Sequence, residues 1–230
     1  METFETFLII KGLQPITVSG HVKAMERIIR NMGKEPSIMD ARAFIGTLYV
    51  SNHSYSYKMN QAKSLEHWME YKGNPVHFGR QRKPKPLIKD TLSEGEVTRL
   101  FMATKNSRER AILALLAYGA IRPKELCKLK VSDVNLALKQ VRILQGKGFK
   151  DGTVYLPEKC IETLMEYLHE YPRRPEEPLF TTLVEKISYK QQALRKLMKV
   201  LAYRAGITKR VYPYLLRHTL AINMVKRGAH

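Results

Sequence analysis

Apolar side chains recur at helical spacing through the first third of the chain, and this pattern predicts a small all-helical domain. One set recurs every three or four residues, at Val18, Val22, Met25, Ile29 and Met32. That spacing places the set on one face of a helix, and Gly33 is typical of the residue that ends one. Further helices are predicted over 2–10, 37–49 and 55–71. We therefore expect residues 1–79 to form a domain of four short helices.

Beyond residue 90 the spacing of apolar residues is again helical, except in one region where apolar and polar residues alternate as they do in strands. Ser93 and Glu96 form a capping-box pair, which predicts that a helix begins there. Helical segments are also predicted over 107–118, from Arg122-Pro123, over 161–168 and 194–201, and from Pro213 onward. Alternation over 140–144 and 153–156 predicts two strands, joined by a glycine-containing hairpin loop at 146–152. The predicted fold class is mainly α with a small antiparallel β-hairpin sheet, in two lobes.

A basic segment with two prolines separates the two parts. Residues 80–90 also contain five basic residues, and the prolines interrupt any helical period and favour an extended connection. We therefore predict a helical domain over 1–79, a basic linker over 80–90 and a second domain over 91–230.

Net charge gives the first indication of a partner. The chain has 40 Lys and Arg against 21 acidic residues, a net charge of +19. Residues 1–79 hold nine basic and seven acidic residues, whereas residues 80–230 hold thirty-one and fourteen. A charge so concentrated implies a polyanionic partner, most often nucleic acid, with a merely solvated basic surface as the alternative. Five of these cations are expected to contact the nucleic acid: Arg80, Arg82, Lys83, Lys85 and Lys150.

Several protein classes are disfavoured by what the sequence lacks. The longest apolar run, 111–121, has eleven residues, whereas a membrane span needs about 20. The first five residues are acidic where a secretion signal is basic. Two cysteines are too few for a disulfide scaffold or a cysteine-only zinc site, and the seven histidines show no metal-ligand spacing. We expect a cytoplasmic, nucleoid-associated protein that uses no metal or cofactor and contacts no membrane.

Three separated motifs match one known pattern. The first is Tyr118-Gly-Ala-Ile-Arg122-Pro-Lys-Glu125-Leu-Cys-Lys-Leu-Lys-Val-Ser-Asp133. The second is Gly146-Lys147-Gly148-Phe-Lys150 followed by Val154-Tyr-Leu-Pro157, and the third is Tyr212-Pro-Tyr214-Leu-Leu-Arg217-His218-Thr-Leu-Ala221. In this order they resemble the first conserved box, the β-hairpin lysine motif and the His-x-x-Arg box of tyrosine recombinases, the phage-integrase and Xer-like enzymes. The resemblance runs through nearly the whole chain.

The resemblance implies a site-specific recombinase or integrase that breaks and rejoins DNA strands through a 3′-phosphotyrosine. Arg122 and Arg217 would donate paired hydrogen bonds to the non-bridging phosphate oxygens, which gain negative charge in the transition state. Lys147 would protonate the departing 5′-oxygen. Tyr214, which shares a helix face with Arg217, would hydrogen-bond the phosphate. Phosphotyrosine conserves the bond energy, so ATP is unnecessary.

The same resemblance implies supporting roles and partners. Glu125 and Asp133 would tie the first box together by hydrogen bonds, and His218 would fill the helix face beside the site. Residues 1–79 would be the core-binding domain and 91–230 the catalytic domain, and the two would close around a double-stranded attachment site. The complete enzyme would act as a tetramer on DNA, whereas a monomer is expected for this chain.

Two departures from the family pattern change the expected activity. Tyr214 stands where the family usually has histidine, and a tyrosine hydroxyl with a pKa near 10 would be a poor base. None of the twelve tyrosines lies at the position of the nucleophile, which should follow the Arg217 helix. We therefore expect the catalytic domain to be incomplete at its C-terminus, and residues 1–230 to bind DNA without a covalent link.

The sequence leaves alternatives open for each assignment. Arg122 could serve only to pair with Glu125, and Tyr214 could be a packing residue. Lys150 could act in place of Lys147. The alternative functions are a non-catalytic DNA-binding regulator or excision factor on the same scaffold, and a type IB topoisomerase-like nicking-closing enzyme. An RNA-binding module is disfavoured because no aromatic ribonucleoprotein motif is present.

Overall fold

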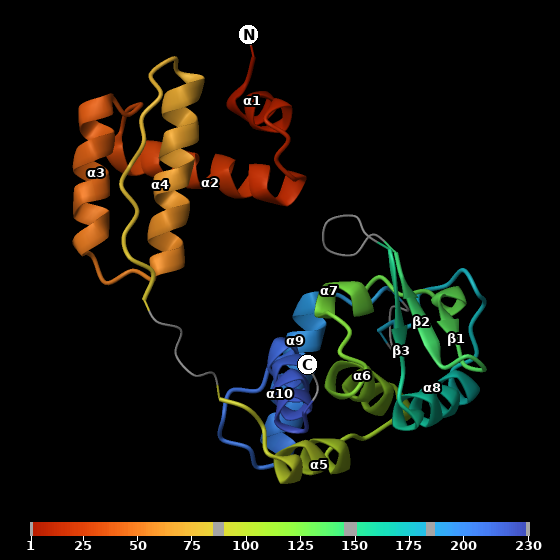
Figure 1. The fold of residues 1–230 in the computed structure, drawn as a ribbon. Helices are drawn as coiled ribbons and strands as arrows, with labels where there is room; N and C mark the ends of the chain where they lie inside the picture. The colour runs from red at the N-terminus through yellow and green to blue at the C-terminus, as the bar shows by residue number, and fades with distance from the viewer. Residues whose placement is uncertain (1, 85–89, 145–150, 183–186, 229–230) are drawn as a thin grey trace. The chain divides into compact units, whose positions relative to one another are not determined.

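Two separate hydrophobic cores divide the chain into the units Met1–Leu87 and Ile88–His230. The computed structural model describes residues 2–84, 90–144, 151–182 and 187–228 (Figure 1). The division after Leu87 falls inside the basic segment 80–90. None of the described helices is long and apolar enough to span a bilayer.

Four helices form the first unit, as the periodicity predicts. They are α1 (Phe4–Ile10), α2 (Pro15–Met32), α3 (Ile38–Val50) and α4 (Tyr55–Tyr71). Helix α4 contacts the other three and buries Leu65, Trp68 and Met69 in the core. Local side chains set the helix ends: Ser37 begins α3 with a capping box, and Gly33 ends α2 with φ at 70°.

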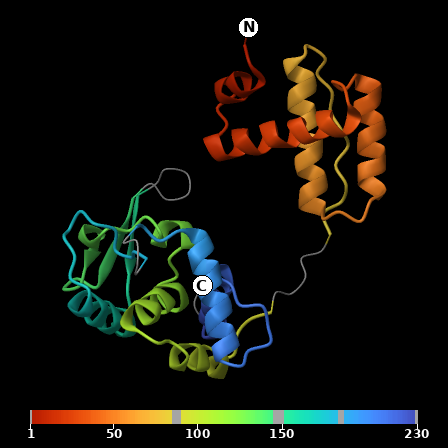
Figure 2. The same ribbon diagram turned by 180° about the vertical axis from the view of Figure 1, so that it is seen from behind.

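The second unit is built around one buried helix. Its helices are α5 (Glu94–Met102), α6 (Ser107–Ala117), α7 (Pro123–Leu126), α8 (Glu158–Glu170), α9 (Gln191–Arg204) and α10 (Pro213–Lys226). Residues 111–116 of α6 are fully buried, because α5, α8 and α10 contact this helix (Figures 1 and 2). The predicted capping box of Ser93 and Glu96 is confirmed at the start of α5.

A small antiparallel sheet completes the second unit. Its strands are β1 (Val134–Asn135), β2 (Gln140–Ile143) and β3 (Gly152–Tyr155), in the order β1-β2-β3. The predicted hairpin of β2 and β3 is confirmed, with Val141 opposite Val154. Strand β1 was not predicted, because two residues are too few to show alternation. Three predicted site residues lie outside the described residues: Lys85, Lys147 and Lys150.

The first unit buries two histidines against each other. His21 on α2 and His67 on α4 have ring centroids 5.1 Å apart, and both side chains are buried. Ser64 donates to the Asn60 carbonyl, so its Oγ accepts a hydrogen bond of 2.8 Å from His21 Nδ1. Burial lowers the pKa of His67 to about 4 and also lowers the pKa of His21, with nearby Lys63 adding to both effects. Both rings are therefore neutral in the folded unit at neutral pH.

We expect the first unit to lose stability as the pH falls from 7 to 5. An unfolded histidine takes up a proton near pH 6.5 and a buried one does not, so the unfolded state binds more protons in this window. For His67, whose pKa in the folded unit is about 4, the loss is on the order of 2 kcal/mol by pH 5, and His21 acts in the same direction. Trp68, the chain's one tryptophan, lies in the core of the first unit. Urea unfolding followed by Trp68 fluorescence therefore measures the free energy of unfolding of the first unit within the full chain.

A matched pair of variants separates this effect from general acid sensitivity. His67→Leu removes the titrating group and should weaken the pH dependence, whereas His53→Gln alters an exposed histidine and should leave it unchanged. A urea midpoint that stays constant from pH 7 to 5 in the unsubstituted chain would contradict the prediction.

Candidate functional site

A tight turn after α6 places Arg122 at the start of α7. Gly119 lies so close to the preceding helix that a Cβ there would sit 2.9 Å from the Leu115 carbonyl oxygen and 3.0 Å from Leu156 Cδ2. Ala120 follows with φ at 49°, in the left-handed region that few non-glycine residues adopt. Ile121 is fully buried and fixes the end of the turn. Arg122 is then the N-cap residue of α7, with Pro123 in the first helical position.

Glu125 holds Arg122 in place. Its carboxylate accepts a bond of 3.0 Å from the Arg122 backbone N–H and contacts Arg122 Nη1 at 2.5 Å. The ion pair foreseen for these two residues therefore forms. The ion pair leaves part of the Arg122 guanidinium available, because this group has five N–H donors and the Arg122 side chain is 41% exposed. Asp133 accepts a bond of 2.8 Å from the Lys130 backbone N–H and so stabilises the turn before β1.

Helix α10 brings Arg217 to the same turn. Arg217 Nη1 donates a hydrogen bond to the carbonyl oxygen of Ala120, two residues before Arg122. Two arginines that are 95 positions apart in the sequence thus meet at one piece of backbone. The Arg217 side chain is half-buried, and His218 beside it on α10 is also half-buried. Tyr214, one turn earlier on the same helix, is 50% exposed.

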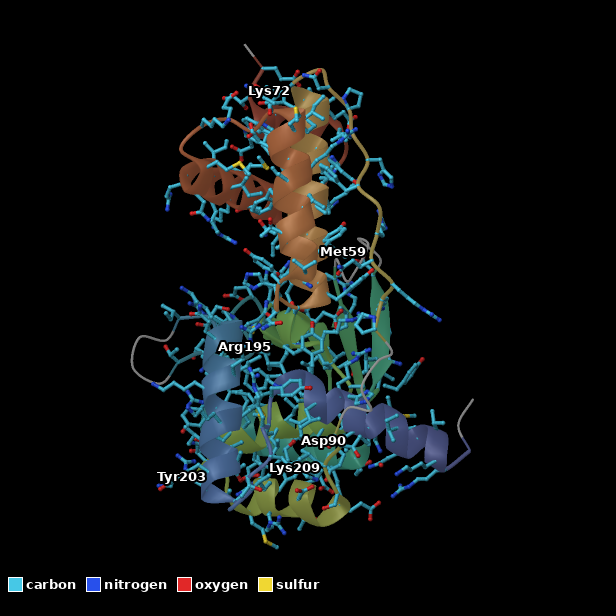
Figure 3. All side chains as sticks on the ribbon, turned by 90° about the vertical axis from the view of Figure 1, so that its left-hand side faces the viewer. Met59, Lys72, Asp90, Arg195, Tyr203 and Lys209 are labelled. Atoms are coloured by element: carbon cyan, nitrogen blue, oxygen red, sulfur yellow. The ribbon has the colours of Figure 1, made fainter. Side chains whose placement is uncertain are left out.

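An open groove of about 1010 Å³ lies beside this turn, and we call it the basic groove. Helix α9, which contacts both α7 and α10, supplies one wall with side chains spaced by four residues: Gln191, Arg195, Lys199 and Tyr203. The segment 207–212 and the start of α10, with Lys209, Arg210 and Tyr214, supply the rest, and Pro123 lines it from α7. Figure 3 shows Arg195 and Tyr203 along α9.

The basic groove carries four cations and no acidic residue. Lys209 is engaged, because its Nζ donates to Glu96 Oε2 at 3.0 Å and to the Thr91 carbonyl at 3.2 Å. Arg195, Lys199 and Arg210 form no ion pair with any described residue. Their charge is therefore open to a polyanion that enters the groove.

Sequence reasoning missed all four groove cations. The signal was present, because Arg195 and Lys199 are four residues apart on a predicted helix, and Lys209-Arg210 directly precede the Tyr212 motif. The predicted cations Arg80, Arg82 and Lys83 are exposed and belong to the first unit's end of the chain.

The two cysteines offer no reactive thiolate. Burial raises the pKa of Cys127 to about 11 and that of Cys160 to about 12. Both thiols are protonated at neutral pH, so neither is an activated nucleophile. No group of three His, Cys, Asp or Glu side chains in the described ranges is arranged to hold a metal ion.

Comparison with known proteins gives one family. The model of the phage integrase family matches residues 90–230. The chain is 30% identical over 186 residues to a tyrosine recombinase of Pseudothermotoga lettingae, which covers 79% of this chain and 64% of that protein. It is 27% identical over 236 residues to tyrosine recombinase XerA of Pyrococcus furiosus, covering 99% of this chain and 80% of that one. The chain thus spans less than two thirds of the first relative and four fifths of the second.

Two solved structures are similar to the fold described above. The crystal structure of XerA recombinase has a TM-score of 0.56 and 26% identity, and the match covers 99% of this chain and 84% of that one. The Tn1549 transposon integrase, solved in complex with circular intermediate DNA, has a TM-score of 0.74 at 16% identity, covering 100% and 88%. At 16% identity, the similarity to the Tn1549 integrase shows a shared fold and nothing further.

The turn that presents Arg122 predicts a specific sensitivity at Gly119. Gly119→Ala should destabilise the second unit by about 1–3 kcal/mol, because the added methyl overlaps backbone that cannot move freely. Thermal unfolding followed by circular dichroism measures the change. Gly95→Ala is the matched control: it meets only Ser93 Oγ, at 4.0 Å, and lies in α5, where alanine is favoured. Equal melting temperatures for Gly119→Ala and the unsubstituted chain would contradict the packing argument.

Proposed function

Since the chain belongs to the phage integrase family, we propose that it is a site-specific DNA recombinase that breaks and rejoins strands through a 3′-phosphotyrosine. The observation that supports this most directly is the meeting of Arg217 with the turn that presents Arg122. Two half-exposed guanidiniums fixed on one short piece of backbone are suited to hold a single phosphodiester.

Each arginine keeps donors for the phosphate after its structural bonds are made. Arg122 uses part of its fork on Glu125, and Arg217 uses Nη1 on Ala120. The remaining N–H groups would bind the non-bridging oxygens, whose negative charge grows as a phenolate attacks phosphorus. Because these donors are held by the turn and by Glu125, they require little reorganisation when the charge develops.

Tyr214 and Lys147 complete the proposed chemistry. Tyr214 lies at the edge of the basic groove, one turn before Arg217, so its hydroxyl would hydrogen-bond the phosphate. Lys147 would act as the general acid for the departing 5′-oxygen, a role that rests on the resemblance because Lys147 lies outside the described residues. Glu125, Asp133 and His218 would keep their supporting roles.

The basic groove would carry the DNA backbone toward this site. Its three cations without described ion pairs would follow phosphates. The start of α10 adds to the positive potential, because no side chain caps its first-turn N–H groups. Residues 1–79 would be the core-binding domain, 80–90 the basic linker and 91–230 the catalytic domain. The complete enzyme would act as a tetramer on DNA, and residues 1–230 would be a monomer.

A suicide-substrate experiment tests the proposed site. No tyrosine follows Arg217 in residues 1–230, so we expect this chain to bind the nicked duplex without forming a covalent adduct. A longer form that includes the family's nucleophilic tyrosine should form the adduct. In that form Arg122→Ala and Arg217→Ala should each lower adduct formation by about a hundredfold or more, with folding unchanged by circular dichroism. An adduct from residues 1–230, or normal cleavage by either arginine variant, would refute the assignment.

Salt dependence of DNA binding tests the basic groove. Lys199→Ala should weaken duplex binding and reduce the slope of log affinity against log salt by about 1, because one phosphate contact is lost. Lys196→Ala is the matched control, since Lys196 is exposed on the same helix but does not line the groove. If the two variants behave alike in fluorescence-anisotropy titrations, the groove does not carry the DNA.

A further inference from the structure

One backbone peptide group in the turn after α6 is held at both of its polar atoms. This group joins Ala120 to Ile121. Its N–H, which belongs to Ile121, donates to the Leu115 carbonyl of α6 at 3.3 Å. Its carbonyl, which belongs to Ala120, accepts from Arg217 Nη1 of α10. The peptide group therefore links the end of α6 to α10, and its orientation decides whether the Ala120 carbonyl faces Arg217.

Arg217 depends on this carbonyl for its position. Among the described residues, the Ala120 carbonyl is the one acceptor that bonds to the Arg217 guanidinium, and no described carboxylate forms an ion pair with it. The side chain is half-buried, and a long arginine side chain has many rotamers when nothing bonds to its end. A bond to a fixed carbonyl selects the rotamer that points the guanidinium at the turn.

Ala120 directs its carbonyl through an unfavourable backbone conformation. Its φ is 49°, in the left-handed region that L-residues other than glycine and asparagine rarely adopt. The other described non-glycine residue with positive φ, Lys139, lies in the exposed turn before β2. Because φ is the rotation about the N–Cα bond, a return of Ala120 to negative φ would turn its carbonyl away from Arg217. Conformations of this kind gather at functional sites.

The residues on either side of Ala120 fix the path of the chain, but not the direction of this carbonyl. Gly119 has no room for a Cβ beside the Leu115 carbonyl oxygen, so it packs directly on α6. Ile121 is fully buried. These two contacts hold the turn where it is, and the left-handed conformation of Ala120 sets the orientation of the peptide group between them.

We propose that Ala120 is a positioning residue whose left-handed backbone aims its carbonyl at Arg217 and so holds the guanidinium where a phosphate would bind. The inference rests on the proposed function, because it concerns how Arg217 is presented to a phosphodiester. Donors that are already in place need no reorganisation as charge develops. Loss of this orientation should therefore slow strand cleavage more than it weakens DNA binding.

Hydrogen exchange in residues 1–230 tests whether Ala120 and Arg217 hold the peptide group. The exchange rate of the Ile121 N–H, measured by NMR, reports how often that group opens. Ala120→Thr and Arg217→Ala should each raise this rate about tenfold, since a β-branched residue is poorly suited to the left-handed region. Ala120→Asn is the matched control: asparagine is similar in size to threonine but tolerates this region, so it should lower the rate about twofold.

The Tyr118 N–H is the internal reference, because it donates to the Ala114 carbonyl at 2.8 Å at the end of α6 and should exchange at a constant rate. An Ile121 rate that stays unchanged in Ala120→Thr or in Arg217→Ala, with the fold intact by circular dichroism, overturns the proposal. A parallel change at Tyr118 shows general fraying and overturns it too. If Ala120→Thr unfolds the unit, Ala120→Asn decides: an Ile121 rate that is not lowered overturns the proposal.

Adduct formation by the longer form with the nucleophilic tyrosine tests the positioning role. At saturating protein, Ala120→Thr should lower the single-turnover rate about tenfold and change the duplex Kd less than twofold, whereas Ala120→Asn should keep the rate. In the Arg217→Ala background, Ala120→Thr should change the remaining rate less than twofold, because the side chain that it positions is gone.

The outcomes separate positioning from general damage. Losses that simply add in the double variant, or a full rate for Ala120→Thr, overturn the positioning role. If the longer form with Ala120 and Arg217 intact makes no adduct, the proposed function fails. The exchange rates then still decide whether Ala120 and Arg217 hold the peptide group.

Discussion

The hydrogen bond from Arg217 to the Ala120 carbonyl is the interaction on which the proposed site depends. It joins α10 to the turn after α6, and that turn also fixes Arg122. The turn has a rigid base, because residues 111–116 of the preceding helix α6 are fully buried. Arg217 donates to a peptide carbonyl and forms no ion pair with a carboxylate of any described residue, so its positive charge is not neutralised there. The same side chain can therefore position the turn and attract a phosphate.

Net charge alone overstates what the second unit offers to DNA. Several of its basic residues form ion pairs with carboxylates: Arg110 with Glu166, Lys139 with Glu158, Arg204 with Glu109 and Arg227 with Glu94. These pairs contribute little to the long-range field, because each carries its own counter-charge. The cations best placed for a polyanion are Arg195, Lys199 and Arg210 of the basic groove, which no acidic residue lines. Position, more than the total of +19, makes this face suited to a polyanion.

Local chemistry explains which features could be predicted from the sequence. Helix ends at Gly33 and Ser93 were predictable because a cap is decided within four residues. Strand β1 was not, since two residues carry no period. The contact between Arg217 and Ala120 spans 97 positions, and no local pattern encodes it; only the resemblance placed Arg217 and Arg122 in one site. The groove cations could not be predicted, because basic residues four positions apart also occur on any solvated helix face.

The excess positive charge is unevenly divided between the two units. The first unit, residues 1–87, holds thirteen basic and seven acidic residues, and four of those basic residues lie in its last eight positions. The second unit, residues 88–230, holds twenty-seven basic and fourteen acidic residues. Under the proposed function, the second unit would therefore contribute the larger part of the long-range attraction to DNA. The first unit, whose residues 1–79 are nearly neutral, would depend on shape and on short-range contacts more than on its overall charge.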